Sequence, residues 1–191
     1  MTRWKRVLRS DPVMADLIEA YGDRRLRPAE NEFRRLVVSI VNQQLSTASA
    51  AAIRERVFDL LGEVTPATVL AADRDALRDA GLSGTKVDYL RNAAEAFQTR
   101  DLTREGLADH DDEAVIDELT TITGIGPWSA EMYCIFVLAR EDVLPLGDLA
   151  IRRGLESLYG CENREAMREV AESWRPYRSY GTLYVWDYYE D

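Results

Sequence analysis

The sequence predicts an all-α protein. Apolar side chains recur with the 3.6-residue period of a helix along most of the chain. Residues that cap helices, namely Asp, Asn, Ser and Thr, stand before many of these runs. No segment shows the alternating pattern or the hairpin turns that are typical of strands. The 191 residues suffice for one domain, or for two small lobes with a real core.

The first half of the chain contains three of the clearer helical segments. Asp11-Pro12 starts a helix that we expect to end near Tyr21, with Asp as its cap and Pro in its first turn. A second helix is expected over Asn31–Val41, and the polar stretch Gln43-Gln44-Leu45-Ser46 interrupts it. The alanine-rich Thr47–Leu61 then permits close approach of another helix. The apolar side chains that carry the period of the second helix are Phe33, Leu36, Val37, Ile40 and Val41.

Shorter helices are expected to begin at Thr65-Pro66 and at Asp73. Gly81–Gly84 reads as a turn, and Thr85 starts a helix that reaches about Thr99. The remaining expected helices are Asp112–Thr121, Ser129–Ala139, Asp148–Tyr159, Asn163–Ser173 and the aromatic segment Pro176–Tyr189.

Composition excludes several classes of protein. Hydrophobic residues make up 46% and charged residues 30%, as in a folded globular protein. No apolar run approaches the roughly 20 residues of a membrane span, and the basic N-terminus lacks the apolar core of a signal peptide. We therefore expect a cytoplasmic protein without a membrane partner. Cys134 and Cys161 are too few for a four-cysteine iron–sulfur cluster or a cysteine-only zinc site. The single histidine, His110, stands in an acidic stretch that reads as a surface loop, which disfavours a histidine-based triad or metal catalysis.

The formal net charge of −10 opposes nucleic-acid binding, because proteins that bind nucleic acid are usually basic. Two interpretations remain: the partner is not nucleic acid, or a basic patch survives locally on an acidic surface. Arginine pairs such as Arg34-Arg35 and Arg152-Arg153 keep the second interpretation open. Acidic residues in excess, with Lys5 and Lys86 as the only lysines, are also typical of proteins from salt-accumulating organisms.

The segment from Leu119 to Asp148 carries the strongest functional signal. Gly124-Ile125-Gly126 separates an amphipathic run from an almost wholly apolar one, and Asp148 follows twenty residues after Trp128. Two glycines permit a tight turn in which the backbone approaches a partner closely. The next helix would present its free N–H groups there, and these favour a phosphate. A phosphate site with one carboxylate at a fixed distance suggests an enzyme that acts on DNA.

The longer string Leu119-Thr-Thr-Ile-Thr-Gly-Ile-Gly-Pro-Trp-Ser-Ala130 is far more specific than its two glycines. With it, the chain resembles a helix-hairpin-helix DNA glycosylase, and specifically the 3-methyladenine DNA glycosylase II family of alkylation repair. Further matching blocks occur in the same order and cover nearly the whole chain. They are Asp11-Pro12-Val13, Ser39-Ile-Val-Asn-Gln-Gln-Leu-Ser46 with Phe33, Gly81-Leu-Ser-Gly-Thr-Lys86, Gly147-Asp148, and Trp174-Arg-Pro-Tyr-Arg-Ser-Tyr180 with Trp186.

The resemblance implies a two-lobed fold with the active cleft between the lobes. We expect residues 31–139 to form the central lobe, which contains the helix-hairpin-helix. Residues 1–30 plus 140–191 would form the second lobe. Larger members of the family add an N-terminal β-rich domain, for which 191 residues are too few.

Asp148 has two compatible interpretations. From its position alone it is a helix cap, the commoner role of an Asp that opens a helix. The resemblance makes it the catalytic aspartate, because it occupies that residue's place after Trp128. Amides at a helix start favour the ionised carboxylate, which would stabilise positive charge on the deoxyribose and orient the attacking water.

The resemblance also implies a base pocket lined by aromatic residues. Trp128 stands where bifunctional relatives carry the lysine that forms a Schiff base with the sugar, so the chain reads as monofunctional. Trp186 would be the second aromatic wall, and electron-rich rings favour a cationic N-alkylated purine. Met132 occupies the position of a tyrosine in the family's pattern, with Tyr133 beside it.

DNA contacts follow from the same resemblance. Gln44 aligns with the side chain that enters the stack where the target nucleotide leaves, and Leu45 is its neighbour. Ser83 and Lys86 would grip a second backbone segment. The expected phosphate anchors of the hairpin are Gly124, Gly126 and Ser129. A monovalent cation would bind the backbone carbonyls of Thr120, Ile122 and Ile125; no cofactor is required and no iron–sulfur cluster is expected.

The sequence thus predicts a monomeric, monofunctional DNA glycosylase that hydrolyses the N-glycosidic bond of alkylated bases such as 3-methyladenine in double-stranded DNA, as a step of base excision repair. A different class remains open: a non-catalytic helix-hairpin-helix module, in which Asp148 only caps a helix. A glycosylase with lyase activity conflicts with Trp128, and a covalent adduct trapped by borohydride would support it.

Overall fold

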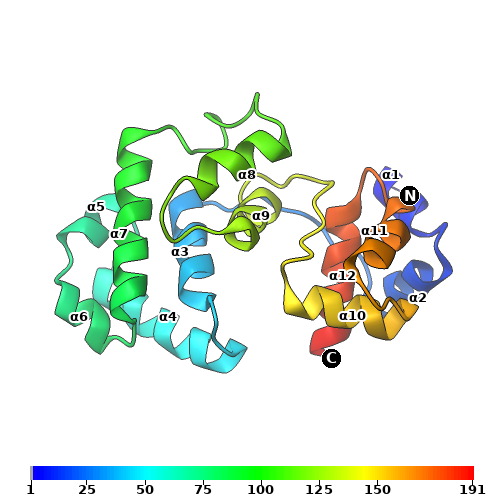
Figure 1. Ribbon diagram of the computed structural model, residues 1–191, viewed down its shortest axis with the longest axis horizontal. Coiled ribbons are helices and arrows are strands. Elements are labelled where there is room, and N and C mark those ends of the chain that lie inside the picture. The colour runs from blue at the N-terminus through cyan, green and yellow to red at the C-terminus, as the bar shows by residue number, and fades with distance from the viewer. Residues whose placement is uncertain (1) are drawn as a thin grey trace. The chain divides into compact units, whose positions relative to one another are not determined.

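The computed structural model describes residues 2–191, apart from the side chain of residue 47. Within that part of the chain the backbone forms twelve α-helices and no strand (Figure 1). The all-α prediction is therefore confirmed. None of the described helices is long and apolar enough to cross a membrane.

The chain divides into two compact units. One contains residues 1–28 and 134–191, so both ends of the chain contribute to it, and the other contains residues 29–133. The second boundary falls inside the helix Pro127–Phe136, α9, rather than in a loop.

The continuous unit is built around a long helix, α7 (Gly84–Thr99), which packs against α3 (Glu32–Asn42) and α5 (Pro66–Ala71) (Figure 1). The five apolar residues that defined the period of α3 are all buried. At the far end of α7 the Phe97 ring meets Phe33 edge to face, with 5.2 Å between the ring centroids. The remaining helices are α4 (Thr47–Leu61), α6 (Arg74–Asp79), α8 (Asp112–Thr120) and most of α9.

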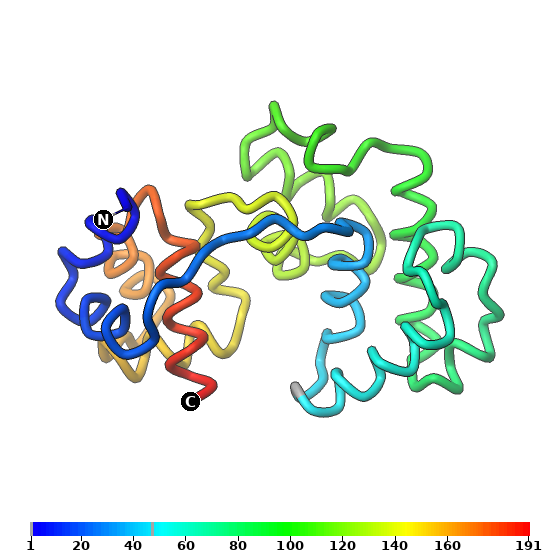
Figure 2. Tube along the Cα trace, turned by 180° about the vertical axis from the view of Figure 1, so that it is seen from behind, coloured from blue at the N-terminus to red at the C-terminus, as the bar shows by residue number. Residues whose placement is uncertain are grey.

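The discontinuous unit joins the two ends of the chain around α12 (Arg178–Glu190), which packs against α10 (Leu149–Tyr159) and α2 (Pro12–Tyr21). Figure 2 shows the N-terminal segment and the C-terminal helix side by side. α10 approaches α12 closely at Gly154, where a Cβ atom would lie 2.5 Å from the Val185 side chain. α1 (Arg3–Leu8) and α11 (Arg164–Glu172) complete the unit.

Two elements differ from the sequence expectation. The helix Arg3–Leu8 was not predicted, since its six residues are too few to display a period; it buries Trp4 and Leu8 on one side. α9 was expected to reach Ala139 but ends at Phe136. Ala139 adopts a left-handed φ of 53°, and the Arg140 amide donates to the Cys134 carbonyl at 2.9 Å, which closes the helix end.

Asp11 ties the discontinuous unit together. One carboxylate oxygen caps α2 by accepting from the amides of Val13 and Met14 at 2.9 and 3.3 Å. The other accepts from the Trp174 indole at 3.0 Å and from the Tyr159 hydroxyl at 2.9 Å. Burial and the nearby Asp11 charge raise the pKa of the Tyr159 hydroxyl. A residue that reads as an ordinary cap therefore also satisfies the indole of the fully buried Trp174.

Replacing Asp11 by Ala should lower the free energy of unfolding by about 3 kcal/mol, because it removes a cap and leaves the buried Trp174 indole without its acceptor. Asp73→Ala is the matched control, since Asp73 caps α6 from an exposed position and should cost about 1 kcal/mol. Urea unfolding measures both. Equal losses in the two variants would contradict the role assigned to Asp11.

Candidate functional site

The predicted hairpin is present in the continuous unit. α8 ends at Thr120 and α9 begins at Pro127, with a tight turn between them. The buried Ile122 and Ile125 anchor this turn, and the Ile125 amide donates to the Ile122 carbonyl at 2.9 Å. The first amides of an α-helix have no acceptor within that helix, and the start of α9 directly follows this turn, the position in which a helix can bind an anion.

The two glycines of the turn serve different needs. Gly124 has a φ of +105°, and a Cβ atom there would lie 2.2 Å from the Tyr89 ring of α7. Gly126 is exposed, and a Cβ atom there would meet nothing within 4 Å. Gly124 is therefore required by the fold, whereas Gly126 leaves the backbone open to a partner.

The loop that follows α3 is bound to this hairpin by Gln43. Its side-chain amide donates to the Gly124 carbonyl at 2.9 Å and to the Ser129 hydroxyl at 3.0 Å. Ser129 is only 1% exposed, so its side chain supports the hairpin from inside, and any contact with phosphate would come from its backbone. Gln44 and Leu45 are exposed on the loop, which is where a residue that enters the DNA stack needs to be.

Ser83 and Lys86 lie at the start of α7. The exposed Ser83 is the N-cap of the helix and accepts from the Lys86 amide at 3.2 Å. The Lys86 ammonium donates to the carbonyls of Val41 and Gln43, at 2.7 Å each. Its charge is thus directed at its own chain, and burial lowers its pKa.

Three of the residues predicted for the base pocket lie on α9 in the continuous unit. Trp128 is half-buried in the first turn of α9, beside the hairpin. Met132 is buried, and Tyr133 belongs to the core: its hydroxyl donates to the Leu102 carbonyl at 2.6 Å and its ring meets Phe97 edge to face.

Asp148 and Trp186 lie together in the discontinuous unit. Asp148 is the N-cap of α10, and one of its carboxylate oxygens accepts from the Ile151 amide at 3.0 Å. The same oxygen accepts from the Trp186 indole at 3.2 Å, and the Trp186 ring stacks on Phe136 with 5.6 Å between centroids. Trp186, predicted as a pocket wall, therefore also holds the carboxylate.

Arg152, which in the sequence stands out only as part of a basic cluster, lies beside Asp148. Its guanidinium donates to the carbonyls of Leu146 and Gly147, at 2.9 Å each, and so fixes the loop that delivers Asp148. The signal was available in the sequence, because a side chain four residues after a helix cap lies over the same helix start.

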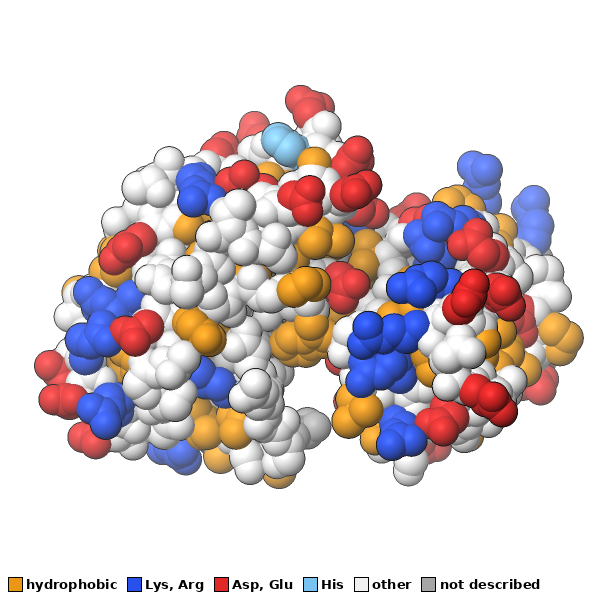
Figure 3. All heavy atoms as spheres, viewed as in Figure 1, with side chains coloured by type: hydrophobic (Ala, Val, Ile, Leu, Met, Phe, Trp, Pro, Cys, Tyr) orange, Lys and Arg blue, Asp and Glu red, His pale blue; other side chains and the backbone are white. Residues whose placement is uncertain are grey.

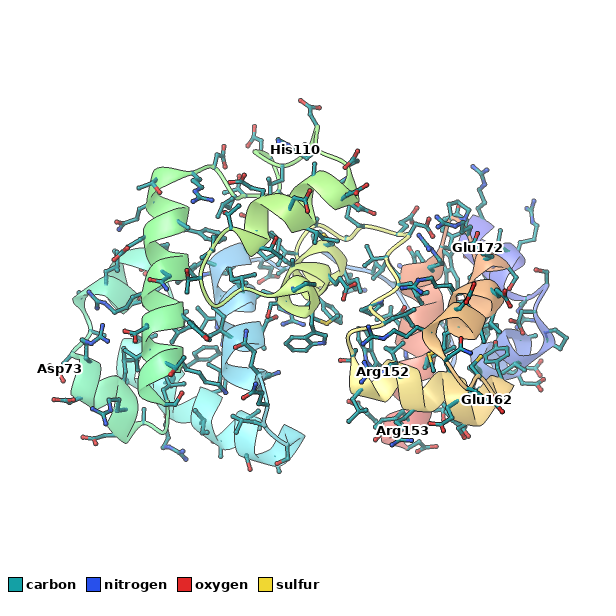
Figure 4. The ribbon with its side chains drawn as sticks, in the orientation of Figure 1. Asp73, His110, Arg152, Arg153, Glu162 and Glu172 are labelled. Atoms are coloured by element: carbon teal, nitrogen blue, oxygen red, sulfur yellow. The ribbon has the colours of Figure 1, made fainter. Side chains whose placement is uncertain are left out.

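Basic side chains gather over α10 despite the acidic composition (Figure 3). Arg152 and Arg153 lie on that helix (Figure 4), and Arg153 pairs with Glu156. A shallow hollow beside them is lined by Arg164 as well, and also by Glu156 and Glu162. Three arginines thus gather along and beside the helix that Asp148 caps, although acidic side chains accompany them.

The hairpin carbonyls are chemically suited to the expected monovalent cation. Neutral oxygens are the donors that such cations prefer, and a carbonyl that accepts one hydrogen bond, as that of Ile122 does, retains a second lone pair. Elsewhere, no three His, Cys, Asp or Glu side chains among the described residues are grouped so that they could hold a metal ion.

Comparisons with known proteins agree with this geometry. Residues 37–176 match the HhH-GPD superfamily of base excision DNA repair proteins. The DNA-3-methyladenine glycosylase 1 of Schizosaccharomyces pombe is 30% identical over 190 residues, which cover 96% of this chain and 80% of that protein. The DNA-3-methyladenine glycosylase 2 of Escherichia coli is 30% identical over 85% of this chain, which spans 59% of its length.

Solved structures lead to the same group. A DNA-3-methyladenine glycosidase from Bacillus halodurans superposes with a TM-score of 0.83 at 35% identity, over 98% of this chain and 89% of that one. The Schizosaccharomyces pombe 3-methyladenine DNA glycosylase in complex with abasic DNA gives 0.85 at 30% identity, over 97% and 95%. The chain belongs to the HhH-GPD superfamily of base excision DNA repair proteins and, within it, to the 3-methyladenine DNA glycosylase family.

Proposed function

We propose that the protein is a monofunctional DNA glycosylase that hydrolyses the N-glycosidic bond of cationic alkylated purines, such as 3-methyladenine, in double-stranded DNA. The observation that carries this proposal is the environment of Asp148. Its carboxylate is half-buried, capped by the Ile151 amide and held by the Trp186 indole. Both donors bind the carboxylate and fix its direction.

An ionised Asp148 supplies what this hydrolysis needs. The bond between C1′ and the base nitrogen breaks with both electrons going to the base, so positive charge develops on the deoxyribose. A nearby carboxylate stabilises that charge and orients the water that adds to C1′. The water loses a proton to the solvent as it adds to C1′, and the DNA is left with an abasic site. The cationic purine takes both electrons of the broken bond, so it departs as a neutral molecule and needs no protonation.

The hairpin and the α3–α4 loop would hold the DNA. The exposed Gly126 and the first amides of α9 suit a backbone phosphate. The carbonyls of Thr120, Ile122 and Ile125 would hold a monovalent cation, which supplies positive charge for the same phosphate. Gln44, exposed on the loop with Leu45 beside it, would fill the space that the extruded nucleotide leaves.

The aromatic residues direct the choice of base. Trp128 and Trp186 present electron-rich indole rings, which bind a cation more strongly than a neutral base of the same size. A cationic purine also has a weakened glycosidic bond, so modest stabilisation by one carboxylate suffices. Trp128 carries no amine and cannot form a Schiff base with the sugar, so the reaction stops at the abasic site.

Asp148→Asn should reduce base release from alkylated DNA about 100-fold or more, because Asn keeps the helix cap but carries no charge. Affinity for DNA and the free energy of unfolding should change little. Single-turnover release of the base from methylated DNA measures the rate, and a binding titration measures affinity.

Asp111→Asn is the matched control, since Asp111 caps α8 from an exposed position in the same manner. It should leave base release unchanged. If the wild type and both variants release no base while binding DNA equally, the protein is the non-catalytic module and the enzyme proposal fails.

Trp186→Phe should slow base release about tenfold, since it keeps a ring against Phe136 but removes the hydrogen bond to Asp148. Trp174→Phe removes a similar bond, from a buried indole to Asp11, and should cost stability without slowing the folded enzyme. Single-turnover rates and urea unfolding of both variants separate the two effects. A Trp186→Phe enzyme that is fully active would contradict the positioning role.

A further inference from the structure

The α3–α4 loop contains a strained residue at the position proposed to enter the DNA. Gln44 has a φ of +57°, in the left-handed region that costs a non-glycine residue about 1–2 kcal/mol. Such a conformation persists only where the surrounding contacts impose it. Gln44 itself is exposed, and the residue before it, Gln43, makes contacts that join the loop to the rest of the unit.

Lys86 holds this loop from the side of α7. Its ammonium bridges the carbonyl of Val41, in the last turn of α3, and that of Gln43, the residue directly before Gln44. Carbonyls at the end of a helix attract a cation, so the bridge is favourable in itself. It also fixes the direction of the chain as it enters the strained position.

Gln43 holds the same loop from the side of the hairpin. Its side-chain amide reaches the Gly124 carbonyl and the Ser129 hydroxyl, while its own carbonyl receives Lys86. Three segments that are far apart in the sequence are thereby joined: the start of α7, the loop and the hairpin.

The residue type agrees with this role. Only two of the 24 basic residues in the chain are lysines, and Lys86 is one of them. An ammonium is a compact charge whose three N–H donors can converge on two carbonyl oxygens. Lys86 is half-buried, and burial lowers its pKa, as expected of a cation directed inward.

We propose that Lys86 is a positioning residue for base extrusion: its bridge to Val41 and Gln43 holds Gln44 rigidly in the conformation that replaces the extruded nucleotide. The proposal rests on the function proposed above and assigns to Lys86 a role other than contact with a DNA phosphate. A loop that is already ordered loses less conformational entropy on entering the stack, and extrusion from a paired duplex is the step that benefits.

The test compares Lys86→Met with the wild type on two DNAs, each with one 7-methylguanine. In the first the lesion is paired in a duplex, and in the second it lies in a bulge where no partner has to be displaced. Base release from the paired site should fall tenfold or more, and release from the bulge less than threefold. Equal losses on the two DNAs, or no loss, would overturn the proposal.

A second readout needs no base release. In the Asp148→Asn background, fluorescence of a 2-aminopurine next to the lesion rises when the neighbouring base leaves the stack, and adding Lys86→Met should reduce this rise severalfold. A normal rise would overturn the proposal. The two proposals can fail separately. If the wild type raises the fluorescence but releases no base, the enzymatic function fails. The role of Lys86 then still stands if Lys86→Met removes the rise in fluorescence.

Salt dependence separates positioning from direct contact with DNA. A lysine that neutralises a phosphate contributes about one to the slope of log affinity against log salt, so its loss lowers that slope by about one. For Lys86→Met the slope should not change. A slope lowered by about one, together with normal extrusion, would identify Lys86 as a phosphate contact and overturn the proposal.

Two further variants serve as a substitute for Lys86→Met and as a control. Lys86→Gln is shorter and uncharged and cannot make the same bridge, so it should show the same selectivity for the paired lesion if Lys86→Met does not fold. Lys5→Met is the control, since Lys5 is the other lysine and pairs with Asp23 in the other unit. It should behave as the wild type in every assay.

Discussion

The proposed active site depends on one interaction, the hydrogen bond from the Trp186 indole to the carboxylate of Asp148. With the Ile151 amide it places two donors on one oxygen of a helix cap, so the carboxylate is held in a fixed direction. The surrounding features of the discontinuous unit serve that arrangement. Phe136 stacks on the indole, and Arg152 anchors the loop before Asp148.

In the continuous unit, too, polar side chains near the candidate site hold the backbone in place. Gln43 donates to the hairpin, and Lys86 donates to the loop after α3. In the proposed complex, direct contacts with DNA would be left to backbone groups and to exposed side chains on the loop. Such a surface needs few cations, which is consistent with a chain of net charge −10. Neutral backbone contacts also depend less on salt than lysine–phosphate pairs do.

Much of the fold could be predicted because the helix signals are local. The period of α3 and the caps Asp11, Ser83 and Asp148 are visible in the sequence, and the structure confirms these helices. α1 was not predicted because six residues are too few to show a helical period. The predicted end of α9 was too late because Ala139 adopts a left-handed φ, which alanine rarely does.

The candidate site was predictable only in part, and for a physical reason. Residue identity at Trp128, Asp148 and Trp186 could be matched to a family pattern, but the direction of a side chain depends on contacts between distant segments. The sequence predicts Lys86 as a phosphate contact, and nothing in it indicates the bonds to Val41 and Gln43. It predicts Tyr133 as a pocket residue, and nothing in it indicates the hydrogen bond to the Leu102 carbonyl.

In the proposed reaction, a fixed carboxylate and aromatic rings remove cationic bases by hydrolysis. The most direct measurement is chromatographic identification of the bases that the wild-type protein releases from DNA containing 3-methyladenine and from DNA containing hypoxanthine. Release of the cationic 3-methyladenine should be much faster than release of the neutral hypoxanthine. Equal rates for the two bases would contradict selection by charge, and release of neither base would contradict the enzyme itself.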